Sequence, residues 1–556
     1  MPFAVRRVSG VPGRWHIEVR GLQRPGTRAA AQAVESALAA LAGVNRAEVN
    51  GALGRVTVWH DHAVVSRADL VRAVVEAEAE QGLADQEPAR GSTRHPGDPW
   101  QWARHGMRMG AALIGAGYAA GARLLPVRAI PAAVPAVAAL IDHTPVLRDL
   151  AESRLGHRLT DLLLEMANKG GNALAQQPAN LLIDAIAHWL QLREARARYL
   201  VWQRWDETLS GRASGHRADP VTPPPPRRIV AFPDGPVERI ANRVGPAALA
   251  STAVLVFPVC SPPRALGVLR AGVTRAARLG REAFAAQLGA SLAGRRVLEL
   301  DPGALRRLDR VSCVVIDPDV LITSRRVVDQ ALALDGQHAT AAVLTLRVHE
   351  LLDLTHPAMP QRRADWSVAP LDGSQTSQTS QTALPPEIAA AVTQARRGGA
   401  LVVGIRRRDR LVGVVTVVPD LDPLAEALVA AARQAGSVAV ADGPAGAPAG
   451  LSERLAVPRT VPGGLRLRGS IQQLQQDGHA VVLVSASGRA ALSVADVGIG
   501  IAGRTPTAPW EADLLTGPDL AGACAVLGSV PLAGKVSRLS AQLALGGSAL
   551  GGLLAA

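Results

Sequence analysis

The sequence contains very little lysine and few aromatic residues, and these shortages bear on what the chain can bind. Lysine occurs only at Lys169 and Lys535, so arginine carries almost all the positive charge behind the net charge of +13. A basic chain first suggests nucleic acid, but a nucleic-acid site needs arginines gathered on one face with aromatic residues between them. Aromatic residues make up 3% of the chain and the arginines are scattered along it. We therefore expect no nucleic-acid partner.

Cysteine and long apolar runs are scarce as well. Cys260, Cys313 and Cys524 lie far apart, and no pair has C-x-x-C or C-x-C spacing. This spacing excludes a disulfide framework and a thiolate metal cluster made of near neighbours. The start of the chain has no continuous apolar stretch of the kind found in secretory signals.

The first 85 residues predict a small α/β domain. Strand-like and helix-like patterns follow in the order strand, helix, strand, strand, helix, which is typical of the ferredoxin-like fold. The expected elements are a strand at Trp15–Arg20, a helix at Thr27–Leu41, a hairpin at Ala47–Trp59 and a helix at Arg67–Glu80. Residues 86–99 are rich in proline and glycine and predict a linker.

Residues 100–205 and 246–299 predict a bundle of helices that we expect to lie at a membrane. Their apolar runs are shorter than the roughly 20 residues that cross a bilayer, so a bundle of buried soluble helices is the alternative. Tryptophans interleaved with arginines before residue 206 favour a membrane interface. We expect the cell membrane as the location, with the soluble domains in the cytoplasm. The apolar runs are Met109–Ala122, Val127–Ile141, Ala179–Leu192 and Ala247–Cys260.

The remaining residues predict a doubly wound sheet with an insertion. Strands alternate with helices over residues 300–323 and 401–530, as in a mostly parallel α/β sheet. The buried strand Val311–Ile316 ends in Asp317, which should therefore lie at the carboxyl edge of the sheet. Residues 324–400, which include a threefold SQT repeat, predict a low-complexity insertion.

Several motifs carry a resemblance to a known family. Residues 314–323 read VVIDPDVLIT, which resembles the first motif of the haloacid-dehalogenase fold that P-type ATPases use for their phosphorylation domain. Other stretches resemble the heavy-metal and cation pumps of that family in the same order along the chain. They are Val34–Val58, within a heavy-metal-associated type of domain, and Thr274–Asp317, Val412–Asp420, Gly478–Val484 and Ala495–Ile501.

The resemblance covers most of the chain and is specific in the order and spacing of its motifs. It points to the N-terminal half of large tandem pumps of high-GC bacteria, in which a degenerate half precedes a working one. It implies a phosphorylation-type domain at residues 300–323 and 401–530 and a remnant nucleotide-binding insertion at 324–400. Residues 206–245 are then a linker with a remnant of the actuator domain.

The resemblance also implies that the chemistry of a pump has been lost. Asp317 holds the position of the phosphorylated aspartate, but the family's lysine and threonine are replaced by Pro318 and Asp319. Neither supplies the positive charge that a phosphoryl group needs. The counterpart of the magnesium motif, Ser485–Ala490, contains no carboxylate, and the family's TGD is Ala441–Gly443. We therefore expect Asp317 to be vestigial, with ATP and magnesium lost and no other cofactor.

Two further pairs of residues concern metal binding, and a third pair concerns an alternative activity. The metal-binding cysteines of the N-terminal domain fall on Arg24 and Thr27, and the membrane Pro-Cys falls on Thr274-Arg275. Arginine cannot ligate a cation and repels one, so we expect no metal site. The pair Asp317-x-Asp319 also matches haloacid-dehalogenase phosphatases, but that class needs a lysine and distal carboxylates, which have no counterpart here.

These observations lead to one functional hypothesis and two alternatives. The hypothesis is a non-catalytic module that associates with a membrane and with a catalytically intact cation pump. The alternatives are an active cation-transporting P-type ATPase and a decaying fragment without function. Residues 531–556 resemble the segment where the family's membrane helices resume, and their apolar run, Leu543–Ala556, has only 14 residues. We expect the chain to be the detached first half of a two-half pump.

Overall fold

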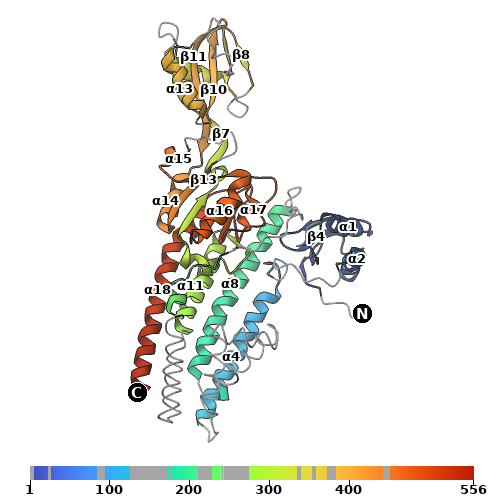
Figure 1. Ribbon diagram of the computed structural model, residues 1–556. Coiled ribbons are helices and arrows are strands. Elements are labelled where there is room, and N and C mark those ends of the chain that lie inside the picture. Colours follow the sequence, from blue (N-terminus) through green and yellow to red (C-terminus); the bar gives the residue numbers. More distant parts are fainter. Residues whose placement is uncertain are drawn as a thin grey trace.

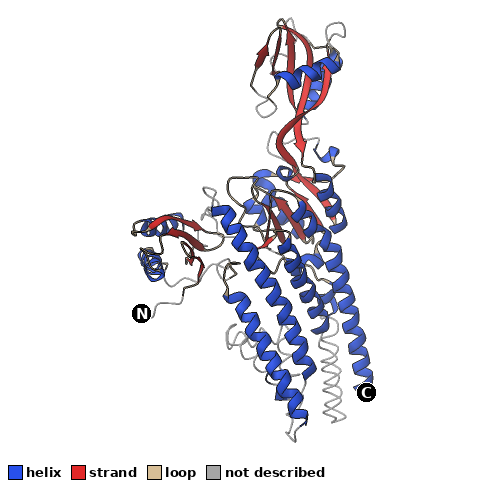
Figure 2. Ribbon diagram, turned by 180° about the vertical axis from the view of Figure 1, so that it is seen from behind, coloured by secondary structure: helices blue, strands red, loops and turns tan. Residues whose placement is uncertain are grey.

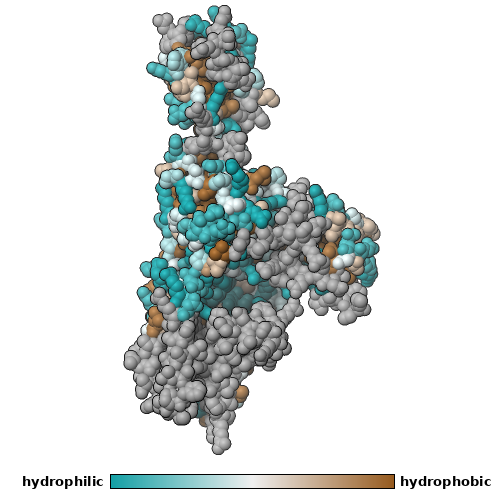
Figure 3. Space-filling view, viewed as in Figure 1, coloured by the Kyte–Doolittle hydropathy of each residue, from teal (hydrophilic) through white to brown (hydrophobic). Residues whose placement is uncertain are grey.

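The structure is a computed structural model with four parts, namely an N-terminal domain, a set of long helices, a central domain built on a sheet, and an insertion. The N-terminal domain lies beside the central domain, the long helices run away from it, and the insertion extends at the opposite end (Figure 1). Hydrophilic side chains cover much of the central domain on the face that Figure 3 shows. The structure describes residues 6–22, 27–83, 94–124, 170, 173–174, 178–210, 228, 230–240, 242, 275–334, 340–353, 359–371, 384–397, 399–442 and 451–555.

The N-terminal domain is a four-stranded antiparallel sheet with two helices. The predicted order of strand, helix, strand, strand, helix is present, and one further strand, β1, precedes it. Strand β1 pairs with β2 through a turn at Pro12-Gly13 and fills an outer place in the sheet order β1-β2-β4-β3. The elements are β1 (Val8–Val11), β2 (Arg14–Glu18), α1 (Thr27–Ala39), β3 (Val44–Asn50), β4 (Arg55–His60) and α2 (Arg67–Glu80).

Four long helices pack in series, α4 on α8, α8 on α11 and α11 on α18 (Figure 2). One predicted boundary here is wrong, because helix α8 continues through residues 206–210, where we expected a linker. Helix α18 begins at Ala521, inside the region assigned to the phosphorylation-type domain, and its first turns pack in the core of that domain. Among the described helices, none combines the length and apolarity needed to cross a membrane. Their bounds are α4 (Trp100–Leu124), α8 (Pro178–Ser210), α11 (Arg275–Gly294) and α18 (Ala521–Ala555).

The central domain is a seven-stranded sheet in the order β13-β12-β6-β14-β15-β16-β5. All neighbouring strands are parallel except β5, which is antiparallel at the edge. The α/β character predicted for this region is therefore confirmed. The strands are β5 (Leu298–Glu299), β6 (Cys313–Ile316), β12 (Ser437–Asp442), β13 (Thr460–Pro462), β14 (Val481–Ser485), β15 (Val497–Ile501) and β16 (Leu514–Thr516).

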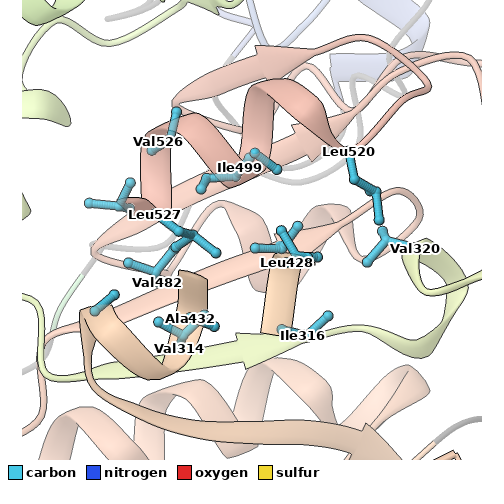
Figure 4. Packing of buried hydrophobic residues seen from close by; sticks show 14 of the residues in the cluster. Val314, Ile316, Val320, Leu428, Ala432, Val482, Ile499, Leu520, Val526 and Leu527 are labelled. Carbon is cyan, nitrogen blue, oxygen red and sulfur yellow. The ribbon is translucent and has the colours of Figure 1, made fainter. Parts of the chain in front are cut away.

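Helices cover both faces of this sheet because successive strand residues point to opposite sides. Val314 and Ile316 of β6 pack with α14 (Ala425–Ala435), the first turns of α18 and the 3₁₀ helix η1 (Leu305–Arg310), as Figure 4 shows for part of the cluster. The alternate residues of β6 pack on the other side against α16 and α17. The remaining elements are η2 (Pro318–Val320), α15 (Leu451–Arg454), η4 (Gly464–Arg466), α16 (Leu467–Gln476) and α17 (Arg489–Leu492).

The insertion has its own five-stranded antiparallel sheet, in the order β7-β11-β10-β9-β8. We placed residues 401–421 in the doubly wound sheet, and this is wrong. These residues form a hairpin whose second strand, β11, pairs with β7 along most of its length, so the insertion begins at β7 and ends after β11. Its elements are β7 (Ile322–Ala333), α12 (Ala341–Leu351), β8 (Gln361–Arg363), β9 (Trp366–Pro370), α13 (Pro386–Arg397), β10 (Leu401–Arg407) and β11 (Arg410–Leu421).

Arg504 joins the base of the insertion to the central domain. Its Nη1 donates to the carbonyl of Ile322, at the start of β7, over 2.8 Å, and its Nη2 donates to the carboxylate of Asp422, directly after β11. Its Nε donates to the carbonyl of Pro518 over 3.1 Å, in the loop before α18. One guanidinium therefore ties both ends of the insertion to the segment that leads into α18.

Candidate functional site

The candidate site lies at the carboxyl edge of the central sheet, where β6 and β14 end side by side. Ile316 and Val484 are partners in the parallel ladder, so the residues that follow them, Asp317 and Ser485, are brought together. The Ser485 hydroxyl donates to Oδ2 of Asp317 over 2.6 Å, and the Gly488 backbone N–H donates to the Ser485 oxygen over 2.8 Å. The position predicted for a phosphorylated aspartate is thus occupied by a hydroxyl-bound carboxylate.

A second serine–aspartate pair lies beside the first. Asp319 is in the 3₁₀ turn η2 that follows β6, and the Ser487 hydroxyl donates to its Oδ2 over 2.6 Å. Asp319 is exposed, whereas Asp317 is only 7% exposed. Two loops, one after each strand, are therefore held together by two hydroxyl–carboxylate hydrogen bonds.

The electrostatic surroundings of Asp317 favour its neutral form. The pKa of Asp317 is raised to about 6, mainly by burial; the Ser485 hydrogen bond opposes this rise and the negative charge of Asp319 adds to it. Arg489, at the start of α17, donates from Nη2 to the Thr507 hydroxyl over 2.7 Å and lies 3.8 Å from Glu511. The Arg489 guanidinium therefore interacts with the side chains of Thr507 and Glu511.

The other predicted positions fall at the same edge or outside the described residues. Asp442 ends β12, next to β6, and is exposed, and Ala486 is buried directly after β14. Arg24, Thr274, Cys260, Gly443 and the apolar runs Val127–Ile141 and Ala247–Cys260 lie outside the described residues. In the described part of the chain, no three His, Cys, Asp or Glu side chains are grouped so that they could hold a metal ion.

The structure also shows a docking site for the N-terminal domain that the sequence did not predict. Asp206 of α8 is buried, and it accepts hydrogen bonds from Arg14 of β2, with Nε 2.7 Å and Nη2 2.6 Å from Oδ2. His16 Nε2 lies 3.2 Å from the same oxygen. Leu53, from the turn between β3 and β4, packs with Trp202 of α8 in a buried cluster shared with the central domain. Because these residues are distant in the chain, no local pattern indicates their contact.

Part of the predicted linker 206–245 is bound to the central domain. Arg228 Nη1 donates to Oδ2 of Asp496 over 2.8 Å, and both side chains are almost fully buried. The Phe232 ring has guanidinium groups over it from Arg228, at 5.4 Å, and from Arg310, at 4.9 Å. Within the segment expected to be a linker with a remnant of the actuator domain, Arg228 and Phe232 therefore contact the central domain.

Comparisons with known proteins identify the lineage. No protein-family model matches the chain. Over 97% of its length the chain is 32% identical to the protein named probable cation-transporting ATPase I of Mycobacterium tuberculosis H37Rv. Over 98% of its length it is 31% identical to the protein of the same name from Mycobacterium leprae. The chain is therefore similar to about one third of each of these two proteins. The predicted resemblance to P-type cation pumps is confirmed.

The chain is much shorter than these relatives. It spans 34% of the length of the M. tuberculosis protein and 36% of the length of the M. leprae protein. Among solved structures, a zinc-transporting PIB-type ATPase in the E2P state matches 62% of this chain and 58% of its own chain. That match has 17% sequence identity and a TM-score of 0.39.

Proposed function

We propose that the chain is a catalytically inactive relative of cation pumps that associates with an active pump at the cell membrane, with its soluble domains in the cytoplasm. The observation that carries this proposal is the pairing of Asp317 with Ser485 and of Asp319 with Ser487. Asp317 holds the position where the homologous motif would accept a phosphoryl group, and Asp319 replaces the threonine of that motif. Here they are bound by neutral hydroxyl groups.

Phosphoryl transfer to a carboxylate requires nearby positive charge, because the transferred group and the acceptor are both anionic. In the family's motif a lysine follows the acceptor aspartate, and in this chain the residue is Pro318. Asp319 adds a negative charge beside the acceptor, and its charge raises the pKa of Asp317. Removing one stabilising group of this kind costs about 10²–10³ in rate, so the combined replacements support an inactive site.

The test is phosphorylation of the purified full chain by radiolabelled ATP with magnesium. We expect no acid-stable, hydroxylamine-labile label above that of an Asp317→Asn variant, while an active cation pump assayed in parallel becomes labelled. Label that appears in the wild-type chain and disappears in Asp317→Asn would favour the alternative, an active ATPase that couples ATP hydrolysis to transport of a metal ion.

The partner and the location are supported by the exposed apolar side chains of the long helices. Ile114 of α4, Ile186 of α8 and Leu543 of α18 are 76%, 60% and 75% exposed. Large exposed apolar side chains on neighbouring helices are typical of surfaces that contact lipid or other helices. Affinity purification from solubilised membranes should therefore recover the chain together with a pump that carries intact phosphorylation and magnesium motifs. Recovery of the chain from the soluble fraction without a pump would contradict the association.

A further inference from the structure

Two neighbouring hairpin turns form the outer end of the insertion. The turn between β8 and β9 contains Ala364 and Asp365, and the turn between β10 and β11 contains Arg408 and Asp409. Strands β9 and β10 are antiparallel partners, with Trp366 opposite Arg407, so both turns lie at the same end of the sheet. In Figure 1 this sheet is the part of the molecule farthest from the free ends of the long helices.

Arginine is concentrated in these two turns and in the strand ends beside them. Residues 362–366 and 406–410, here called the arginine tip, contain six arginines against two aspartates, a net charge of +4. Every arginine of the tip is exposed except Arg406, which is half-buried. Four of these arginines lie within residues 406–410, and pairing of β9 with β10 brings them close to Arg362 and Arg363, which are about 40 residues away in the chain.

Three of the arginines and the tryptophan form one row across four strands. Arg363 pairs with Trp366, Trp366 pairs with Arg407, and Arg407 pairs with Arg410. Side chains of directly opposite residues lie on the same face of a sheet. The guanidinium of Arg407 is 5.4 Å from the centre of the Trp366 ring, which holds it in place. The paired strands therefore place these positive charges in a fixed order on one face of the sheet.

The ion pairs within the tip show what its guanidinium groups bind. Arg408 Nε lies 2.9 Å from Asp365, and Arg362 lies 3.7 Å from Asp409. Each hairpin therefore supplies a carboxylate to an arginine of the other hairpin. All four side chains are at least half exposed. Exposed pairs of this kind contribute little to stability, so carboxylates of a partner can replace them.

We propose that the arginine tip binds an acidic peptide segment of a partner protein. Binding of single-stranded nucleic acid would use Trp366 as a stacking surface for a base. Guanidinium groups of Arg347 and Arg407 already lie over the Trp366 ring, each at 5.4 Å, and the ring packs against the buried cluster of the insertion. The tip instead presents a row of guanidinium groups. Their N–H donors suit carboxylates spaced along an extended peptide.

The experiment measures binding of the full chain to a fluorescent peptide of twelve glutamates by anisotropy at low ionic strength. We expect saturable binding that becomes about tenfold weaker in the variant Arg363→Gln/Arg410→Gln, which removes two exposed arginines of the row. The matched control is Arg325→Gln/Arg326→Gln, which removes the same charge from β7 at the other end of the same sheet and should bind like the wild type.

Three results would overturn the proposal. The first is no saturable binding of the peptide by the wild-type chain. The second is an equal loss in both variants, which would mean a response to net charge alone. The third is tighter, tip-dependent binding of a twelve-residue oligothymidine or of phosphatidylserine vesicles, which would assign the tip to nucleic acid or to a lipid surface.

Discussion

The Ser485 hydroxyl and the Asp317 carboxylate are joined by a 2.6 Å hydrogen bond at the carboxyl edge of the central sheet. This bond gives a buried carboxylate a partner that carries no charge. The Gly488 N–H, which donates to the same hydroxyl oxygen, orients the serine, because the oxygen accepts from the backbone while its hydrogen points to Asp317. The two hydrogen bonds link the loop after β6 to the loop after β14.

Asp317→Asn should stabilise the protein at neutral pH. Burial raises the pKa of Asp317 in the folded protein from 3.8 to about 6, so the folded state holds this proton more tightly than the unfolded state. The stability that this proton contributes is fully present below about pH 4 and is lost as the pH rises through about 6. The ionised carboxylate then costs up to about 3 kcal/mol at pH 7.5, a cost that asparagine avoids.

Thermal unfolding at pH 4.5 and pH 7.5 measures this effect. The Tm of Asp317→Asn should exceed that of the wild type by more at pH 7.5 than at pH 4.5. The same substitution at exposed Asp477, measured at the same two pH values, is the control for the change of residue type. A pH-independent effect of Asp317→Asn would show that the pKa of Asp317 is the same in the folded and unfolded states.

Asp206→Ala should loosen the N-terminal domain from α8. The substitution removes the carboxylate to which Arg14 donates and beside which His16 lies, and breaking a buried ion pair costs about 3–5 kcal/mol. Hydrogen exchange of the full chain should become faster in β2 and in the turn at residues 51–54, and stay unchanged in β6. Glu207→Ala, at the exposed neighbouring position, should change neither, and unaltered exchange in Asp206→Ala would mean that apolar contacts alone hold the domain.

Gly280→Ala should destabilise the contact between α11 and α18. A Cβ at position 280 would lie 1.9 Å from Oγ and 2.7 Å from Cβ of Ser540, so one helix must move. Overpacking of this kind costs about 1–3 kcal/mol, measured as a fall in Tm. Adding Ser540→Gly should restore most of the loss. Gly294→Ala, in the same helix with nothing within 4 Å of its Cβ position, is the control.

The N-terminal domain should bind copper(I) only after its family ligands are restored. The predicted resemblance places Arg24 and Thr27 at the two positions of the family's cysteine pair, and a soft cation needs thiolates. In titrations of the full chain under reducing conditions, Arg24→Cys/Thr27→Cys should take up one more equivalent of copper(I) than the wild type. Arg24→Cys alone should not retain that equivalent against a chelator. Equal uptake by the wild type and the double variant would place a metal site elsewhere.

Strands and helices with one buried face could be predicted from the sequence. The alternation in residues 14–80 predicts the observed order of elements, and the buried run before Asp317 predicts β6. Strand β1 was missed because it has only four residues and contains Gly10, although Pro12-Gly13 was a visible turn signal. Pairing of Asp317 with Ser485 could have been expected, since adjacent parallel strands end at the same edge.

Other features depend on pairings that no local pattern contains. The valine-rich strands β10 and β11 have the composition of buried parallel strands, and only their antiparallel pairing with β7 and β9 places them in the insertion. The arginine-rich run Arg406–Arg410 is visible in the sequence, but its position beside Arg362 and Arg363 depends on the pairing of β9 with β10. The docking of Arg14 on Asp206 joins residues 192 positions apart.

Arg504 connects the base of the insertion to the start of α18. The chain enters the insertion through β7 and leaves it through β11, and both connections accept hydrogen bonds from this one guanidinium. The same side chain donates to the carbonyl of Pro518, three residues before α18 begins. Because the first turns of α18 lie in the buried core of the central domain, the two ends of the insertion and that core share one hydrogen-bonding side chain.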